Sequence, residues 1–308
     1  MNYTLSQLRI YLKVTSCGSI TKAAEELHLT QPAVSIQLKN FQNQFDFSLI
    51  EVINKKLYIT DFGKEIAIAA ENIINEIDNI NYRSQAYSNK LAGHLKLSIV
   101  STGKYIMPFF LADFMKQHAT VDLTMDVTNK AKVIQSLEQN EVDFALVSIL
   151  PENLRLNKFE LLENELYLVG NKEVNQRKKM DQKTLFDQIP LILREQGSGT
   201  RQTMERFLNK RKFIIKKKME LTSNEAVKQA VIAGLGYSIM PLIGIWNEVD
   251  TGLIKIIPTP GLPIKTMWRL IWLKEKKLSP VADAFLKYLH QEKENIIKKN
   301  FNYSLKKH

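Results

Sequence analysis

The sequence predicts an N-terminal all-α winged helix-turn-helix module, a long linker helix and a C-terminal α/β domain of two subdomains. Residues 19–35 have the pattern of two short helices joined by a tight turn, and apolar residues recur every seven positions from 61 to about 89. After Gly93, short apolar strands alternate with helices, as in a parallel-sheet domain. The expected boundaries are 1–60, 61–90 and 91–292, followed by a basic, disordered tail at 293–308.

Three helices are expected in the first module. Residues 4–7 form a capping box that begins the first helix. Ser19 caps the second helix, and alanines on its inner face allow the close helix crossing of this motif. Thr30 or Gln31 begins the third helix, with Pro32 in its first turn. Residues 49–60 then predict a short two-stranded wing.

The outward face of the third helix is the expected DNA-reading surface. At 100° per residue, its main apolar side chains fall on one side, and Ile36 falls with the polar ones on the other. This helix of the motif lies in the major groove, where Ile36 fits a thymine methyl group and Lys39 a phosphate. For any one side chain alone, a solvated helix face is the alternative. With two lysines from the tip of the wing, the candidate DNA-contacting residues are Thr30, Gln31, Pro32, Ala33, Ser35, Ile36, Gln37, Lys39, Lys55 and Lys56.

Residues 61–89 predict a linker helix that pairs with a second copy of the chain. They contain no proline and one early glycine. An apolar stripe with a period of seven is typical of a coiled-coil seam, so we expect a homodimer. The alternative is a helix that lies on its own domain. The candidate dimerisation residues are Ile66, Ile73, Ile80 and Tyr87.

The rest of the chain is expected to form two subdomains, about 91–161 with 267–292 and 162–266, with a cleft between them. Loops at 101–104 and 197–201 each follow a strand and open a helix, so free backbone N–H groups, hydroxyls and a cation can converge on an anion. For each loop alone, ordinary helix capping is the alternative. Arg194 can equally form a local ion pair with the next residue. The candidate residues for binding an anionic ligand are Ser101, Thr102, Gly103, Lys104, Asn129, Ser148, Arg194, Gly197, Ser198, Gly199, Thr200, Arg201 and Ser223.

Charge is unevenly distributed along the 308 residues. The net charge is +11, but residues 1–90 hold 9 basic and 9 acidic side chains, whereas residues 177–218 hold 13 and 4. The second segment is either a solvated surface or the source of a field that attracts an anionic ligand. The chain has no apolar run of membrane-spanning length and no signal-peptide core, so we expect a cytoplasmic protein without a membrane partner. Its single cysteine, Cys17, cannot form an internal disulfide.

Four stretches carry a resemblance to a known family, at 19–35, 57–63, 141–145 and 223–236. Through them the chain resembles the LysR-type transcriptional regulators over nearly its full length. The resemblance implies a periplasmic-binding-protein-like effector domain with a small-molecule inducer between its lobes. It also implies double-stranded DNA as a partner, and a homodimer or, through the effector domains, a homotetramer.

Two further stretches, at 36–39 and 193–201, are similar to the branch of this family that contains regulators of carbon-fixation operons and of sulfur or cysteine metabolism. The chain departs from the family at Val52, where the wing usually has an arginine, and at Asp46, where a glycine usually shapes the turn. A phosphate contact from position 52 is therefore not expected.

An enzyme and an architectural DNA-binding protein are the alternative functions. The five histidines lie without metal-ligand spacing, and no Gly-x-Ser-x-Gly or phosphate-loop motif occurs. We therefore expect no catalytic residue, no metal and no cofactor. The loops at 101–104 and 197–201 argue against a protein that only oligomerises on DNA. The sequence thus predicts a transcriptional regulator whose DNA-bound state is controlled by a small anionic metabolite.

Overall fold

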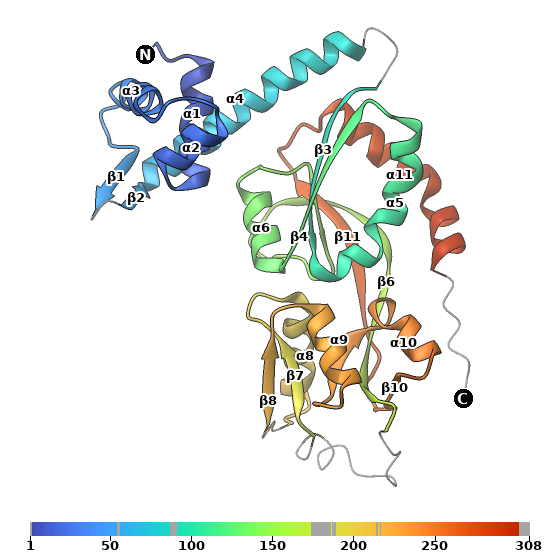
Figure 1. Ribbon diagram of the computed structural model, residues 1–308. Helices are drawn as coiled ribbons and strands as arrows, with labels where there is room; N and C mark the ends of the chain where they lie inside the picture. Colours follow the sequence, from blue (N-terminus) through green and yellow to red (C-terminus); the bar gives the residue numbers. More distant parts are fainter. Residues whose placement is uncertain are drawn as a thin grey trace. The chain divides into compact units, whose positions relative to one another are not determined.

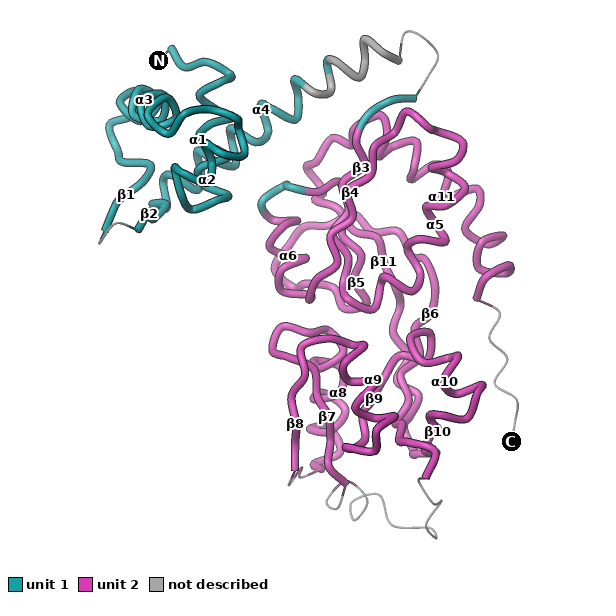
Figure 2. Tube along the Cα trace, viewed as in Figure 1, with its two compact units in different colours: residues 1–93, 139–141 teal, residues 94–138, 142–308 magenta. Residues whose placement is uncertain are grey.

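The computed structural model describes residues 2–53, 56–86, 91–173, 186, 189–213, 215 and 217–301, with the side chains of 78, 79 and 81–86 excepted. The chain divides into two units, residues 1–93 with 139–141 and residues 94–138 with 142–308 (Figure 2). Within the described residues, no helix combines the length and the apolar character needed to cross a bilayer.

The first unit contains the three-helix module, its wing and the long helix (Figure 1). Its helices are α1 (Leu5–Cys17), α2 (Ile20–Glu26), α3 (Gln31–Gln42) and α4 (Asp61–Ala86), and its strands are β1 (Ile50–Ile53) and β2 (Lys56–Ile59). The two strands pair antiparallel, which confirms the predicted wing. The tip residue Lys55 lies outside the described residues.

The predicted helix caps of this unit are all present. The backbone N–H of Gln7 donates to the hydroxyl of Thr4 at 3.3 Å, and the Gln7 side chain accepts from the Thr4 N–H at 2.9 Å. The hydroxyls of Ser19 and Thr30 each accept from the backbone N–H three residues further on, at 3.4 Å. A cap of this kind contributes about 1 kcal/mol, so local sequence sets where each helix begins.

The start of α4 belongs to the core of the module. The buried hydroxyl of Tyr11, on α1, donates to the carbonyl of Gly63 at 2.7 Å. A Cβ at position 63 would lie 2.0 Å from the carbonyl oxygen of Leu49, so only glycine allows this approach. The core around Tyr11 is formed by apolar side chains from all four helices, including the predicted inner face of α3.

The predicted seam of α4 divides into two parts. Ile66 packs against the core of its own module, which is the alternative that the sequence left open. Ile73 and Ile80 are 39% and 61% exposed, as a partner-seeking stripe requires. Tyr87 lies outside the described residues. The alternative therefore holds for Ile66, and a dimer seam through Ile73 and Ile80 stays a prediction.

The second unit is built on a seven-stranded sheet and a smaller two-stranded sheet. The order of the large sheet is β10-β6-β11-β5-β3-β4, with β9 paired to β6, and the small sheet joins β7 and β8 in parallel. The strands are β3 (Gly93–Val100), β4 (Val121–Thr128), β5 (Phe144–Val147), β6 (Leu156–Asn171), β7 (Leu191–Arg194), β8 (Lys218–Leu221), β9 (Ser238–Pro241), β10 (Ile254–Ile256) and β11 (Ile264–Leu273). The large sheet is mixed and not purely parallel, because β3 and β5 pair in parallel whereas β6 runs antiparallel to β9, β10 and β11.

Helices follow most of these strands, as the alternation predicted. They are η1 (Ser101–Tyr105), α5 (Met107–Gln117), α6 (Lys130–Glu138), α8 (Gly199–Lys210), α9 (Asn224–Ile232), η2 (Leu242–Gly244), α10 (Trp246–Asp250) and α11 (Pro280–Asn300). The core of this unit includes β5, whose four residues are all buried, and Trp268 of β11.

The two connections between the subdomains are continuous strands. β6 and β11 pair antiparallel from Leu166 opposite Ile264 to Leu156 opposite Leu273. The expected subdomain boundaries at 161/162 and 266/267 therefore fall inside strands. The first half of β6 was not expected to be a strand, because its polar residues face outward between half-buried ones and leave no continuous apolar run.

The expected disorder of the tail is wrong for residues 293–301. Helix α11 continues to Asn300, where Ile296 and Phe301 are buried. Phe301 stacks on Phe110 with ring centroids 5.8 Å apart. Because Ile296 extends the apolar face of the helix and Lys298 and Lys299 favour its C-terminal end, a lysine-rich sequence remains helical here. Residues 302–308 lie outside the described residues.

Candidate functional site

Helix α3 presents two faces of opposite character. Val34, Leu38 and Phe41 are buried in the module core. On the other face Ile36 is 59% exposed, and Lys39 is also exposed. An exposed apolar side chain suits contact with a base edge in the DNA groove, and a neighbouring lysine suits contact with a backbone phosphate.

The remaining candidate DNA-contacting residues differ in their exposure and in whether their side chains are already hydrogen-bonded. Gln31, Pro32 and Lys56 are exposed, whereas Ala33 and Ser35 are half-buried. The hydroxyl of Thr30 caps α3, and Gln37 accepts a hydrogen bond from the side chain of Gln7 at 3.2 Å. Thr30 and Gln37 therefore have structural partners within the module.

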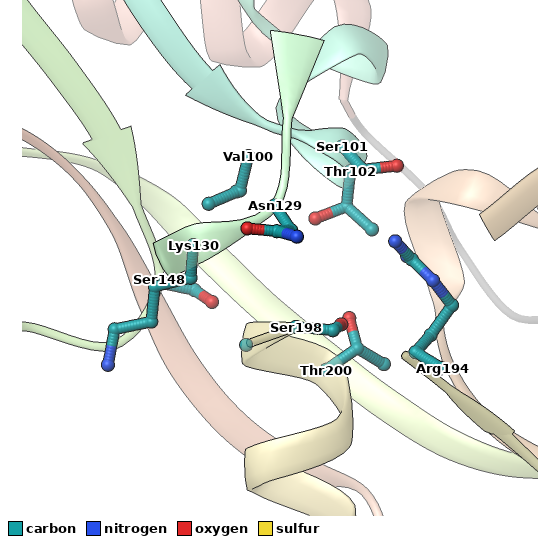
Figure 3. Close-up of a pocket in the computed structure, with 10 residues that line it drawn as sticks. Val100, Ser101, Thr102, Asn129, Lys130, Ser148, Arg194, Ser198 and Thr200 are labelled. Atoms are coloured by element: carbon teal, nitrogen blue, oxygen red, sulfur yellow. The ribbon is translucent and has the colours of Figure 1, made fainter. Parts of the chain in front are cut away.

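The second unit has a small, partly open cavity where the two subdomains meet (Figure 3). Its volume is about 10 Å³, room for about one water molecule. The lining residues are Val100, Ser101, Thr102, Asn129, Lys130, Ser148, Arg194, Ser198, Gly199 and Thr200. Eight of the thirteen candidate ligand-binding residues are thus brought together.

These residues converge because strands of both subdomains end here. From one subdomain, Val100 is the last residue of β3, and Asn129 and Ser148 directly follow β4 and β5. From the other, Arg194 ends β7 and Thr200 lies in the first turn of α8. Ligands of α/β folds bind at this position, where the carboxyl ends of strands meet helix N-termini.

The loop before α8 requires a glycine and ties the subdomains together. Gly197 has a φ of +83°, which an L side chain rarely adopts. Its carbonyl accepts from the backbone N–H of Ala131, on the other subdomain, at 3.2 Å. Ser198 then caps α8 by accepting from the N–H of Arg201 at 3.5 Å. Gly199 and Thr200, at the start of α8, line the cavity, and the first N–H groups of a helix have no partner within it.

Arg194 forms the local ion pair that the sequence left as an alternative. Its guanidinium donates from Nε and Nη2 to the two carboxylate oxygens of Glu195, at 2.8 and 2.9 Å. The side chain is 4% exposed and still lines the cavity. The charge of Arg194 is therefore compensated by Glu195, although its side chain lines the cavity.

Five candidates do not line this cavity. Arg201 is held by Glu205 at 2.7 Å, by Glu220 and by the carbonyl of Arg194 at 2.9 Å, so its charge is used within its own subdomain. Lys104 lies over the ring of Tyr105 at 5.1 Å. The other three are Gly103, Gly197 and Ser223. Gly103 packs against Leu146, and Ser223 caps α9.

Lys130 and Val100 line the cavity although they were not predicted. Lys130 begins α6 one residue after Asn129, in a strand-to-helix position like the one that singled out Lys104. Its ammonium donates to the side-chain oxygen of Gln202 at 3.0 Å, across the subdomain boundary. Burial, followed by the charge of Arg206, lowers the pKa of Lys130.

Among the described residues, no group of three His, Cys, Asp or Glu side chains is placed to hold a metal ion.

Comparisons with known protein families match both parts of the chain. Residues 5–64 match the bacterial regulatory helix-turn-helix protein, lysR family, and residues 88–294 match the LysR substrate binding domain. The HTH-type transcriptional activator CmpR of Synechocystis sp. is 35% identical over 96% of this chain and 97% of its own. The RuBisCO operon transcriptional regulator of Allochromatium vinosum is 33% identical over 95% and 97%.

Solved structures agree with these matches. The regulatory domain of CcmR from Synechocystis PCC6803, in complex with 2-PG, superimposes with a TM-score of 0.61 at 29% identity and covers 68% of this chain and 98% of that one. Full-length CbnR in complex with its target DNA gives a TM-score of 0.64 at 18% identity over 94% and 99%, a likeness of fold.

Proposed function

Because this chain belongs to the LysR family of DNA-binding transcriptional regulators and is not an enzyme, we propose that the cavity between its two subdomains binds a small organic anion that controls transcription. The observation that carries the proposal is the convergence of Ser101 and Thr102 from one subdomain with Ser198 and Thr200 from the other. Because it is a DNA-binding regulator of transcription, we further propose that the protein acts in the cytoplasm.

The chemistry of the cavity favours an anion with several acceptor oxygens. The first turn of α8 supplies backbone N–H groups without helical partners, and the helix dipole is positive at that end. Hydroxyls from both subdomains and the Asn129 amide can donate to the same oxygens. A phosphate or carboxylate offers such oxygens, and the related CcmR domain is known in complex with 2-PG.

The cavity volume implies how occupancy is transmitted. Since about 10 Å³ admits no metabolite, the subdomains must separate or rearrange when the anion binds. A ligand that binds one arrangement better shifts the population toward it. We propose that the chain forms a homodimer through Ile73 and Ile80 of α4 and a homotetramer through its effector domains. The change between the subdomains would alter the geometry of these assemblies and thereby the affinity of α3 for DNA.

Within that proposal, α3 contacts base edges through Gln31, Ser35 and Ile36. Lys39, with Lys56 from the wing, contacts phosphates. Thr30 shapes the start of the helix, since its hydroxyl is used as the cap. A dimer of this kind fits a roughly palindromic operator with half-sites one or more helical turns apart.

The test is a thermal titration of the full-length protein with 2-PG and a panel of other small phosphate and carboxylate metabolites. At least one is expected to raise the Tm of the wild type. Thr102→Val, which removes a cavity hydroxyl at nearly constant shape, should abolish that rise and leave operator affinity unchanged. Thr124→Val, exposed on β4, is the matched control. Absence of any shift would support an architectural protein, and a Thr102 variant that loses DNA binding but keeps the response would contradict the site.

A further inference from the structure

A second and much larger cavity lies beside the first. Its volume is about 440 Å³, within the range of about 300–1,000 Å³ that small-molecule sites occupy, whereas the first has about 10 Å³. Its walls come from the N-terminal half of α6, the first two turns of α8 and the loop before α8. Only Lys130 and Ser198 are shared by both cavities. Of these two cavities, therefore, only the second has room for a metabolite in this conformation.

The charges on its walls are unequally compensated. Arg201 has two carboxylates, those of Glu205 and Glu220, within ion-pair distance. Lys130 forms no ion pair within 4.0 Å among the described residues. The charge of Glu152 acts on it only from further away, and its ammonium donates to the neutral amide oxygen of Gln202. Figure 3 shows the Lys130 side chain extending away from Thr102 and Arg194, two residues that line the first cavity. The positive charge that remains for a ligand is thus that of Lys130.

The opposite part of the wall is apolar. Ala131 and Ile134 lie on α6 beside Pro151, which follows β5. A ligand with a short aliphatic body would cover these side chains and remove them from water, which stabilises the complex by about 25 cal/mol per Å² of apolar area buried. A purely ionic ligand would leave these apolar side chains exposed to water.

We propose that the second cavity is a separate site for a small monocarboxylate with a short aliphatic body. Its carboxylate takes the place of the Gln202 oxygen as the partner of Lys130, and its aliphatic part lies against Ile134 and Pro151. A single ammonium compensates one negative charge, and Glu205 stands in the same wall. A phosphate, with a charge of about −1.5 to −2 at pH 7, is therefore disfavoured relative to a carboxylate.

Occupancy of this site has a defined consequence for the fold. The ligand contacts α6 of one subdomain and α8 of the other, so it favours the arrangement of subdomains seen in this structure. Because the anion proposed for the first cavity requires a change in that arrangement, the two ligands should oppose each other. The second site does not depend on the first being a site, and it can be tested alone.

The experiment is calorimetric titration of full-length protein with sodium butyrate, with inorganic phosphate and sodium chloride at equal ionic strength as comparisons. Butyrate is expected to bind, with phosphate at least tenfold weaker. Lys130→Gln should weaken butyrate at least tenfold, and Lys130→Arg, which keeps the charge, should weaken it less. Lys132→Gln, an exposed lysine on the same helix, is the matched control and should bind as the wild type does.

Ile134→Trp separates this site from the first cavity, because Ile134 lines only the second. The substitution fills the cavity and should abolish butyrate binding while the response to 2-PG or its panel persists. Thr102→Val should do the reverse. Butyrate binding that survives both Lys130→Gln and Ile134→Trp, or phosphate binding equal to that of butyrate, would overturn the proposal, whatever the outcome at the first cavity.

Discussion

The Arg194–Glu195 pair offers the sharpest perturbation of the first cavity. Arg194 is 4% exposed and lines the cavity, yet both of its hydrogen bonds go to the Glu195 carboxylate. Glu195→Gln keeps the shape and one acceptor oxygen but removes the compensating charge. We expect the variant to be less stable and to bind an anionic effector more tightly.

Both magnitudes follow from the geometry. Glutamine retains one of the two hydrogen bonds, so the loss is one bond to a charged group, about 1.5–3 kcal/mol. For a domain of about 200 residues, where each kcal/mol shifts the Tm by about 2–4 °C, that lowers the Tm by about 3–12 °C. The freed guanidinium attracts an anion about 4 Å away by about 4 kcal/mol at an effective dielectric constant of 20, less the cost of desolvation. We therefore expect affinity to rise about tenfold, equivalent to 1.4 kcal/mol.

The assay is calorimetric titration of wild type and Glu195→Gln with the anion that raises the Tm most. Glu205→Gln is the matched control, since its partner Arg201 keeps Glu220 and lies outside the first cavity. The control should bind the anion as the wild type does. A Glu195→Gln protein that is destabilised but binds no more tightly would refute a ligand role for Arg194 and leave it as a structural ion pair.

Three further predictions concern the first unit. Tyr11→Phe leaves the Gly63 carbonyl without its partner and should lower the free energy of unfolding by about 1–3 kcal/mol, measured by urea titration followed by circular dichroism. Ile80→Glu should dissociate the dimer in sedimentation experiments, and a dimer that persists would contradict a seam through this residue. Ile36→Ala should change the preferred base sequence and not the salt dependence of binding, and equal loss on all sequences would argue against a thymine contact.

The sequence predicts local features of this fold well, because their causes are local. The caps at Thr4, Ser19 and Thr30 each depend on a side chain and a backbone N–H three residues away. The alternation of strands and helices after Gly93 is equally local, and it identified the strand ends and helix starts from which eight predicted residues line one cavity.

Other features depend on partners that lie far apart in the sequence. Arg201 occupies a helix start that suits an anion, yet its guanidinium pairs with Glu220 on β8, in addition to its neighbour Glu205 one helical turn away. Lys130 occupies an equivalent start, and only the fold brings it opposite Gln202. Likewise, the apolar face of α11 continues to Phe301, although the lysines around it suggested disorder.

The central claim is that occupancy of the cavity between the subdomains is coupled to the DNA-bound state. By linkage, an anion that changes operator affinity must have a different affinity for free and operator-bound protein, by the same factor. The decisive measurement is the Kd of the anion for the full-length protein with and without saturating operator DNA recovered from cells. We predict a difference of about 5- to 150-fold. Equal Kd values, with the anion bound in both states, would contradict the account.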